Sequence, residues 1–311
     1  MNTLRQAAEQ YLAMRRSLGF KLQRCGPALL DFIGFLEQHH APYITLALAL
    51  AWAKQPPGAQ PDTWAQRLSQ VRIFARYRSS ADPRTQVPPA ALMPYRPKRA
   101  RPYLYSDTEI RSLLRAALRL SGHDGLRPWA YYCLFGLLTV SGLRVGEAQN
   151  LQLQDLDLKA GVLTIRNAKF GKDRLVPLHA STRRVLSRYL ARRQRLWATR
   201  AVSDYLFVSG RGNRLDGGDI RRTFYRLSRQ IGLRAPGERH GPRLHDMRHR
   251  FASRTLLRWY RTGEEPERRL PVLSAYLGHV HWSDTYWYLS AFPQLMRHAM
   301  SRLERRWERR P

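Results

Sequence analysis

The sequence predicts a mainly α-helical protein of two domains, the second of which also carries a small β-hairpin or sheet. Three observations lead to this prediction. Apolar residues recur at helical spacing along most of the chain. Two neighbouring segments, 161–168 and 173–179, have the composition of short paired strands. The 311 residues exceed the roughly 250 that one hydrophobic core usually organises, and 43% of them are apolar, enough to build globular cores.

Residues 1–87 are expected to form the first, wholly helical domain. Apolar residues at helical spacing mark three amphipathic segments, within 8–20, 29–35 and 63–77. A basic stretch rich in proline follows, and proline interrupts both helices and central strands. Residues 88–103 are therefore predicted to be a linker between domains. Its prolines are Pro88, Pro89, Pro94, Pro97 and Pro102.

Residues 104–311 are expected to form the second domain, an α+β unit that ends in a C-terminal helix. Ser106 followed by Glu109 is the pattern of a capping box and marks the first helix start. An apolar helix over 129–140 is predicted to end at Gly142, with another helix beginning near Val145. Beyond the two strands, we predict helices over 181–197, 218–231, 245–261, 269–277, 283–290 and from 293 onward, and a short strand over 205–209.

The charge of the chain predicts a polyanionic partner. Lys and Arg number 54 against 23 Asp and Glu, a formal net charge of +31. The basic residues are spread over both predicted domains, so both are expected to bind the same partner. A genome rich in GC explains part of the preference for Arg over Lys, but not the shortage of acidic residues.

The sequence shows no sign of membrane insertion or export. The longest apolar stretch near the N-terminus, ITLALALAWA, has ten residues, too few to span a bilayer. The first sixteen residues lack the apolar core of a signal peptide. Cys25 and Cys133 are the only cysteines, and the apolar run around Cys133 predicts a buried thiol. We therefore expect a soluble, cytoplasmic protein, associated with the nucleoid if its polyanion is DNA.

A first polar motif, SGLRVGE, places Arg144 at the predicted start of a helix. The helix dipole disfavours a cation there unless the cation and the free backbone N–H groups share a bound anion. Glu147 lies three residues on and can brace the guanidinium. By itself, the motif also fits an ordinary surface salt bridge.

A second motif, HDMRHR, places His245 and Arg248 on one face of a helix. Such a face offers a proton acceptor or donor beside a fork of N–H groups for phosphate oxygens. A solvated basic helix is the alternative. His249 and Arg250 are expected on other faces, as structural residues or nonspecific contacts to DNA. No acidic or Cys ligand set accompanies the histidines, so no metal site is predicted.

Three further residues complete the set of candidates. Lys169 lies at the predicted hairpin tip, where a flexible cation can donate a proton, and Lys172 is its local rival. His279 follows Gly278 at a predicted helix end. Tyr288 offers a phenol nucleophile, with Tyr286 as the alternative. Taken singly, each also fits a turn, a cap or an aromatic packing cluster.

The order and spacing of these motifs resemble those of the tyrosine recombinase (phage integrase) family. The family has an arginine in a TGLR-like turn with an acid three residues on, a hairpin lysine before RLVPL, then HxxRH, LGH and a tyrosine nine residues later. This chain has SGLRVGE, AKFGKDRLVPL, HDMRH, LGHV and Tyr288, nine residues after His279. It departs from the pattern in the aromatic YWY and in the additional His281 and Trp282.

The resemblance covers about residues 104–292 closely, and residues 1–87 look like the family's helical core-binding domain. It implies a catalytic second domain in a site-specific recombinase or integrase that cuts and rejoins DNA through a 3′-phosphotyrosyl intermediate. The catalytic residues it implies are Arg144, Lys169, His245, Arg248, His279 and Tyr288, with Glu147 orienting Arg144.

In this scheme Tyr288 attacks a backbone phosphate and Arg144 and Arg248 hold its non-bridging oxygens. His245 accepts the phenol proton and Lys169 protonates the leaving 5′ oxygen. The phosphotyrosyl link conserves the phosphodiester energy, so no cofactor is expected, and no P-loop motif is present. The implied partners are double-stranded DNA and a homo- or hetero-tetramer of protomers on two duplexes. The basic segment 294–310 is expected to dock on a neighbour, on its own domain or on DNA.

Three alternatives remain open at the level of sequence. A type IB topoisomerase-like enzyme uses similar residues to relax DNA without strand exchange. A non-catalytic DNA-binding protein could keep a recombinase fold. A basic RNA-binding protein would explain the charge but not the ordered motifs. The target site is not readable from the sequence, and integration, excision, resolution and transposition share one chemistry, although a mobile-element integrase is our first expectation.

Overall fold

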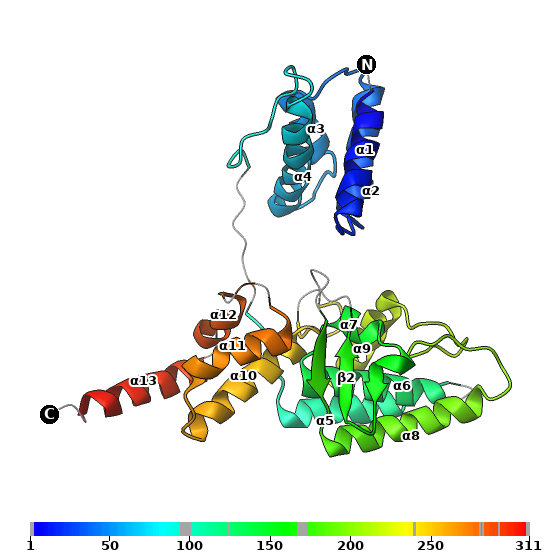
Figure 1. Cartoon of the computed structure of the whole chain (residues 1–311), viewed down its shortest axis with the longest axis vertical. Coiled ribbons are helices and arrows are strands. Elements are labelled where there is room, and N and C mark those ends of the chain that lie inside the picture. Colours follow the sequence, from blue (N-terminus) through cyan, green and yellow to red (C-terminus); the bar gives the residue numbers. More distant parts are fainter. Residues whose placement is uncertain are drawn as a thin grey trace. The chain divides into compact units, whose positions relative to one another are not determined.

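The computed structural model of the chain describes residues 3–93, 101–122, 125–166, 173–238, 241–279, 281, 283–291 and 293–308. The chain divides into two compact units, Met1–Ala100 and Arg101–Pro311 (Figure 1). This division falls within the stretch predicted as a linker, of which residues 94–100 lie outside the described residues. Each unit has a hydrophobic core of its own.

Unit 1 is built from four helices, as far as the structure describes it. Trp52 and Phe32 lie at its centre, fully buried with their rings in contact. The helices are α1 (Leu4–Ser17), α2 (Cys25–Gln38), α3 (Leu46–Lys54) and α4 (Pro61–Ser79). Helix α3 was not predicted, because its sequence is apolar on almost every side and shows no helical stripe. Its start is nevertheless marked locally, since the Thr45 hydroxyl accepts a hydrogen bond from the Leu48 N–H.

Unit 2 combines helices with one small sheet, which confirms the predicted fold class. The helices are α5 (Asp107–Leu118), α6 (Leu126–Ser141), α7 (Val145–Gln149), α8 (Ala180–Leu196), α9 (Gly217–Gln230), α10 (Asp246–Arg261), α11 (Pro266–Leu277), α12 (Ser283–Ala291) and α13 (Pro293–Glu308), with a 3-10 turn over Leu153–Asp155. The predicted capping box is present, with Ser106 and Glu109 each bonded to the backbone N–H of the other.

The sheet of unit 2 has three antiparallel strands in the order β1 (Leu156–Asp157), β2 (Val162–Ile165) and β3 (Arg174–Pro177) within the described residues. The pair β2–β3 is the predicted hairpin, with Leu163 opposite Val176 and both side chains fully buried. The strand predicted over 205–209 is wrong. That segment makes only isolated bridges, Gln152 to Tyr205 and Val208 to Arg214, and its β-like composition instead reflects burial of the segment in the core.

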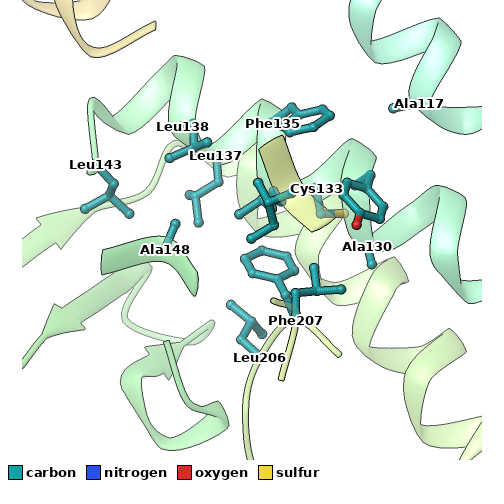
Figure 2. Close-up of a cluster of buried hydrophobic side chains, with 14 of the residues drawn as sticks. Ala117, Ala130, Cys133, Phe135, Leu137, Leu138, Leu143, Ala148, Leu206 and Phe207 are labelled. Atoms are coloured by element: carbon teal, nitrogen blue, oxygen red, sulfur yellow. The ribbon is translucent and has the colours of Figure 1, made fainter. Parts of the chain in front are cut away.

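Helix α6 is the central element of unit 2, and it packs against α5, α8 and α10. Figure 2 shows side chains of α6 gathered with Leu206 and Phe207, which come from the segment of isolated bridges. Cys133 is among them and is 3% exposed, which confirms its predicted burial. In the part of the chain that the structure describes, no helix has both the length and the apolar character needed to cross a membrane.

Two helices end in left-handed glycines that shape the neighbouring loops. Gly142 ends α6 with φ 64°, and Gly278 ends α11 with φ 66°. A Cβ on Gly142 would lie 2.6 Å from the Phe251 ring of α10, so only glycine fits this contact. Gly142 lies two residues before the predicted site residue Arg144, and Gly278 directly precedes His279.

We predict that Gly142→Ala lowers the free energy of unfolding of unit 2 by about 2–5 kcal/mol. The left-handed conformation accounts for about 1–2 kcal/mol, and the clash with Phe251 adds about 1–3 kcal/mol. Gly125→Ala is the matched control, because Gly125 has the same φ of 64° with no atom within 4 Å of an added Cβ. Urea unfolding of both variants checks the prediction, and equal losses in the two would contradict it.

Candidate active site

The candidate site is built at the ends of several elements of unit 2. Arg144 and Glu147 belong to the turn into α7, and Arg174 begins β3. His245 and Arg248 lie at the start of α10, the chain around Gly278 ends α11, and Tyr288 lies on α12. Because most of these residues lie at the ends of helices and strands, residues more than 100 positions apart in the sequence, such as Arg144 and Gly278, come into contact.

The Glu147 carboxylate joins two arginines. Arg144 donates from Nη1 to Glu147 Oε1 at 2.7 Å, and its backbone N–H donates to Oε2 at 2.9 Å. Arg174 donates from Nη2 to Oε2 at 2.7 Å and from Nη1 to Oε1 at 3.1 Å. The Glu147 side chain is only 8% exposed. The ion pair between Arg144 and Glu147 has the i,i+3 geometry that the spacing predicts. The second ion pair, from Arg174 to Glu147, was not predicted.

Glu147 stays ionised in this environment. Burial works to raise its pKa, but the hydrogen bonds and charges of Arg174 and Arg144 outweigh burial and hold the pKa below its usual range. A carboxylate bonded on both oxygens fixes the two guanidinium groups in direction. Arg144 Nη2 also donates to the Gly278 carbonyl at 2.9 Å, and Arg174 Nε donates to the Tyr276 carbonyl at 2.8 Å.

Arg248 is the most buried cation of the site, at 2% exposed. Its Nη1 donates to the Gly142 carbonyl at 2.9 Å and its Nη2 donates to the Leu277 carbonyl at 2.6 Å. Burial, followed by the nearby charge of Arg144, lowers its pKa to about 10, so it remains charged at neutral pH. No carboxylate of the described residues bonds directly to Arg248, and a buried cation in such surroundings favours an anionic ligand.

His245 is neutral at physiological pH. Protein atoms around the imidazole, and then the charge of Arg248, lower its pKa to about 4. The residue keeps an exposed face, because it is the N-cap of α10 rather than part of its interior. The imidazole is therefore neutral and accessible, and it becomes a better proton acceptor when a bound anion offsets the charge of Arg248 and Arg144, both of which lower its pKa.

Tyr288 is enclosed by aromatic rings and is 2% exposed. Its ring stacks on His279 with centroids 6.2 Å apart and lies 5.5 Å from the ring of His249. His279 is oriented in turn by a 2.7 Å contact between its Nδ1 and the hydroxyl of the buried Thr285. Tyr286, two residues earlier on α12, is 50% exposed. The structure thus brings Tyr288, and not Tyr286, into the cluster.

His249 and Arg250 are both buried, which fits the structural role that was one of the two predicted for them, but His249 lies on the same face of α10 as His245 and not on another face. His249 follows His245 by one helical turn, and the two rings meet edge to face with centroids 4.8 Å apart. Its ring is also 5.5 Å from that of Tyr288, centroid to centroid, so it contacts both residues, and it is 6% exposed. Arg250 is buried as well, where it bonds the Tyr105 carbonyl and pairs with Asp107, so it is not a surface contact to DNA.

Of the seven residues singled out by sequence, six lie together in unit 2. They are Arg144, Glu147, His245, Arg248, His279 and Tyr288. Lys169 and its rival Lys172 lie outside the described residues, in the segment 167–172 between β2 and β3. Sequence reasoning missed Arg174 and His249, although RLVPL and HDMRH contain them. No group of three or more His, Cys, Asp or Glu able to hold a metal ion occurs among the residues that the structure describes.

Comparison with known proteins places the chain in a family. The model of the phage integrase family matches residues 105–294. The Sinorhizobium fredii protein y4rB, whose name assigns it to the integrases or recombinases, is 62% identical over all of both chains. The tyrosine recombinase XerC of Thermodesulfovibrio yellowstonii is 31% identical over 74% of this chain and 72% of its own. The chain therefore belongs to the phage integrase family of tyrosine recombinases, as its motifs predict, and is a site-specific recombinase.

Solved structures agree with the fold. The Tn1549 transposon integrase, solved in complex with transposon right end DNA, matches with a TM-score of 0.65 at 18% identity, covering 96% of this chain and 99% of that one. The XerH site-specific recombinase, bound to a palindromic difH substrate, matches with a TM-score of 0.62 at 20% identity, covering 89% and 78%. At such identities the likeness concerns the fold alone.

We predict that His245 titrates well below the ordinary histidine pKa of about 6.5. Because its pKa is lower in the folded chain than in the unfolded one, its contribution to stability is present above about pH 6.5 and is lost as the pH falls toward 4. NMR titration of the imidazole resonances checks this directly. Arg248→Met should raise the His245 pKa, and a wild-type value at or above 6.5 would contradict the assignment.

Proposed function

We propose that this recombinase binds double-stranded DNA and cuts and rejoins it through a 3′-phosphotyrosyl link formed at Tyr288. The observation that carries the proposal is the enclosure of the Tyr288 ring by His249 and His279 within electrostatic reach of Arg248. These groups come from α10, from the end of α11 and from α12. The exposed Tyr286 has no comparable surroundings, which favours Tyr288 as the nucleophile.

Arg144 and Arg248 are proposed to hold the non-bridging phosphate oxygens. Each guanidinium is fixed by a helix-terminal carbonyl, and Arg144 also by Glu147. Positioned donors of this kind contribute about 3 kcal/mol each when charge grows on the oxygens in the transition state. Arg248 keeps N–H groups beyond those given to Gly142 and Leu277, since a guanidinium has five.

In the proposed cleavage step, a bond forms between Tyr288 Oη and phosphorus while the bond from phosphorus to the 5′ oxygen breaks. The phenol proton passes to the neutral imidazole of His245, and the leaving 5′ oxygen takes a proton from Lys169 on the β2–β3 segment. His279 adds a hydrogen bond to the phosphate oxygens. Attack of a 5′-hydroxyl from another duplex on the phosphotyrosine then exchanges strands.

DNA must open the site before this step. Tyr288 is 2% exposed in the chain alone, so a phosphate reaches its hydroxyl only if α12 shifts when DNA binds. The phosphate would then neutralise part of the charge gathered from Arg144, Arg174 and Arg248. We propose that this gain in electrostatic energy drives the shift and restricts reactivity to the DNA-bound chain.

The remaining assignments follow the same scheme. Residues 1–87 are proposed to form the helical core-binding domain, 88–103 a basic linker and 104–311 the catalytic domain. Strand exchange between two duplexes would need four protomers, of one kind or of two. The formal charge of +31, spread over both units, supports DNA contacts from each. Integration of a mobile element is the proposed cellular task.

We predict that wild-type protein forms a covalent adduct with nicked duplex DNA from the sequence flanking its own gene. A protease-sensitive band on a denaturing gel, linked at the 3′ side of the nick, is the expected product. Tyr288→Phe should abolish it, because the nucleophile is lost. Tyr286→Phe is the matched control and should retain it.

The opposite result for the two tyrosines would assign the nucleophile to Tyr286. Site-specific, salt-resistant binding with no adduct would instead favour a non-catalytic DNA-binding protein. Relaxation of a single supercoiled duplex without exchange would favour a topoisomerase.

A second prediction concerns His249. Replacing its ring by Ala removes the contact that holds Tyr288, so adduct formation at saturating protein should slow by about 10- to 100-fold, the cost of a nucleophile misplaced by about 1 Å. His249→Phe keeps a ring and should restore most of the rate. Ser253→Ala, one turn further along α10 and also buried, is the control and should match wild type. An unchanged rate in His249→Ala would remove the proposed role.

A further inference from the structure

Unit 2 has a cavity of about 720 Å³ that the proposed reaction does not use. It lies between the end of α6, the residues that follow β3, the middle of α10 and the middle of α11. Its volume is within the range of about 300–1,000 Å³ usual for binding sites. The catalytic cluster sits instead at the start of α10 and the end of α11.

One wall of the cavity is basic. Arg250, Arg254, Arg258 and Arg261 line it at spacings of four, four and three residues, so they follow one face of α10 for about 16 Å. Arg250 and Arg254 share Asp107. Arg258 and Arg261 are exposed, and neither has a carboxylate within salt-bridge distance in the described part of the chain. The described lining of the cavity includes no acidic residue.

The other wall is apolar and partly open to solvent. Val272 of α11 is 65% exposed and Val140 of α6 is 52% exposed, and both line the cavity. Leu273, Tyr276 and Trp259 line it more deeply. DNA phosphates could satisfy the arginines but would leave these apolar groups in contact with water. A peptide with aliphatic side chains on one face and carboxylates beside them would satisfy both walls.

The chain's own C-terminal helix is a poor match for this cavity. The first two turns of α13 already pack on their own unit, where Leu295 is 2% exposed and His298 stacks on Tyr260 of α10. Residues 293–311 carry six arginines against two glutamates. Placed in the cavity of a second copy, this segment would set arginine against arginine, which costs binding energy.

We propose that the cavity is the docking site for an acidic amphipathic helix of a different protein. Leucine-like side chains would fill the space between Val140, Val272 and Trp259, and carboxylates would pair with Arg258 and Arg261. The chain would then bind an unlike partner through this surface. This inference does not depend on the transesterification at Tyr288.

The test uses the full-length chain and a fluorescein-labelled peptide of about four helical turns, with leucines on one face flanked by glutamates. Fluorescence anisotropy measures its Kd for wild type and for the double variant Arg258→Glu with Arg261→Glu. The matched control is Arg226→Glu with Arg229→Glu on α9, which has the same i,i+3 spacing on exposed arginines away from the cavity. Thermal unfolding confirms that both variants fold.

The expected result is saturable binding that weakens at least tenfold in the α10 variant and less than twofold in the α9 control. A peptide of residues 293–311, and a version of the probe with lysine in place of glutamate, should bind at least tenfold more weakly than the acidic probe.

Equal weakening in both variants would overturn the proposal, because binding of the probe would then depend on net charge alone. Tighter binding of the 293–311 peptide would make a second copy of the chain the occupant. Loss of duplex binding in the α10 variant, without binding of the acidic probe, would assign the wall to DNA.

Discussion

The buried Glu147 carboxylate lies between two arginines that reach it from different parts of the chain, Arg144 in the same turn and Arg174 at the start of β3. Its hydrogen bonds fix both guanidinium groups while the same groups bond carbonyls at the end of α11. Three segments, the turn into α7, the start of β3 and the end of α11, are thereby held in one arrangement. Burying the Glu147 carboxylate alone would cost free energy, and so would placing two unpaired arginines side by side. The carboxylate and the two arginines therefore stabilise one another.

Helix ends supply the second part of this arrangement. Carbonyl groups near the end of a helix lack partners within the helix. Here the carbonyls of Gly142, Leu277 and Gly278 accept from Arg248 and Arg144. The left-handed glycines turn the chain sharply enough to bring α6 and α11 toward the start of α10. Backbone carbonyls that would otherwise need water are satisfied by the two arginines that we propose to hold the phosphate.

The distribution of charge in the candidate site suits a reaction that begins only after the substrate has bound. Among the described residues, no carboxylate bonds directly to the buried Arg248, and Tyr288 is enclosed by rings rather than presented to solvent. In the proposed reaction, the DNA phosphate would supply the negative charge that faces Arg248. A second basic wall, along the middle of α10, faces a cavity with apolar lining and therefore suits a protein partner better than DNA. Helix α10 thus carries Arg248 in the candidate active site and a separate row of arginines along the cavity.

The sequence by itself determined the fold class, the capping box at Ser106 and the β2–β3 hairpin, because these depend on local periodicity and short-range hydrogen bonds. It also singled out six residues that lie together, through motif order and spacing. The sequence did not indicate α3, because its apolar residues are not confined to one face of the helix. It also indicated a strand over 205–209, where burial in the core alone explains the apolar composition. Only the tertiary structure decided that Arg174 shares Glu147, that His249 contacts Tyr288, and that Tyr288 rather than Tyr286 is enclosed. These facts depend on contacts between segments that lie tens of residues apart in the chain, 27 in the case of Glu147 and Arg174, and local pattern does not encode such contacts.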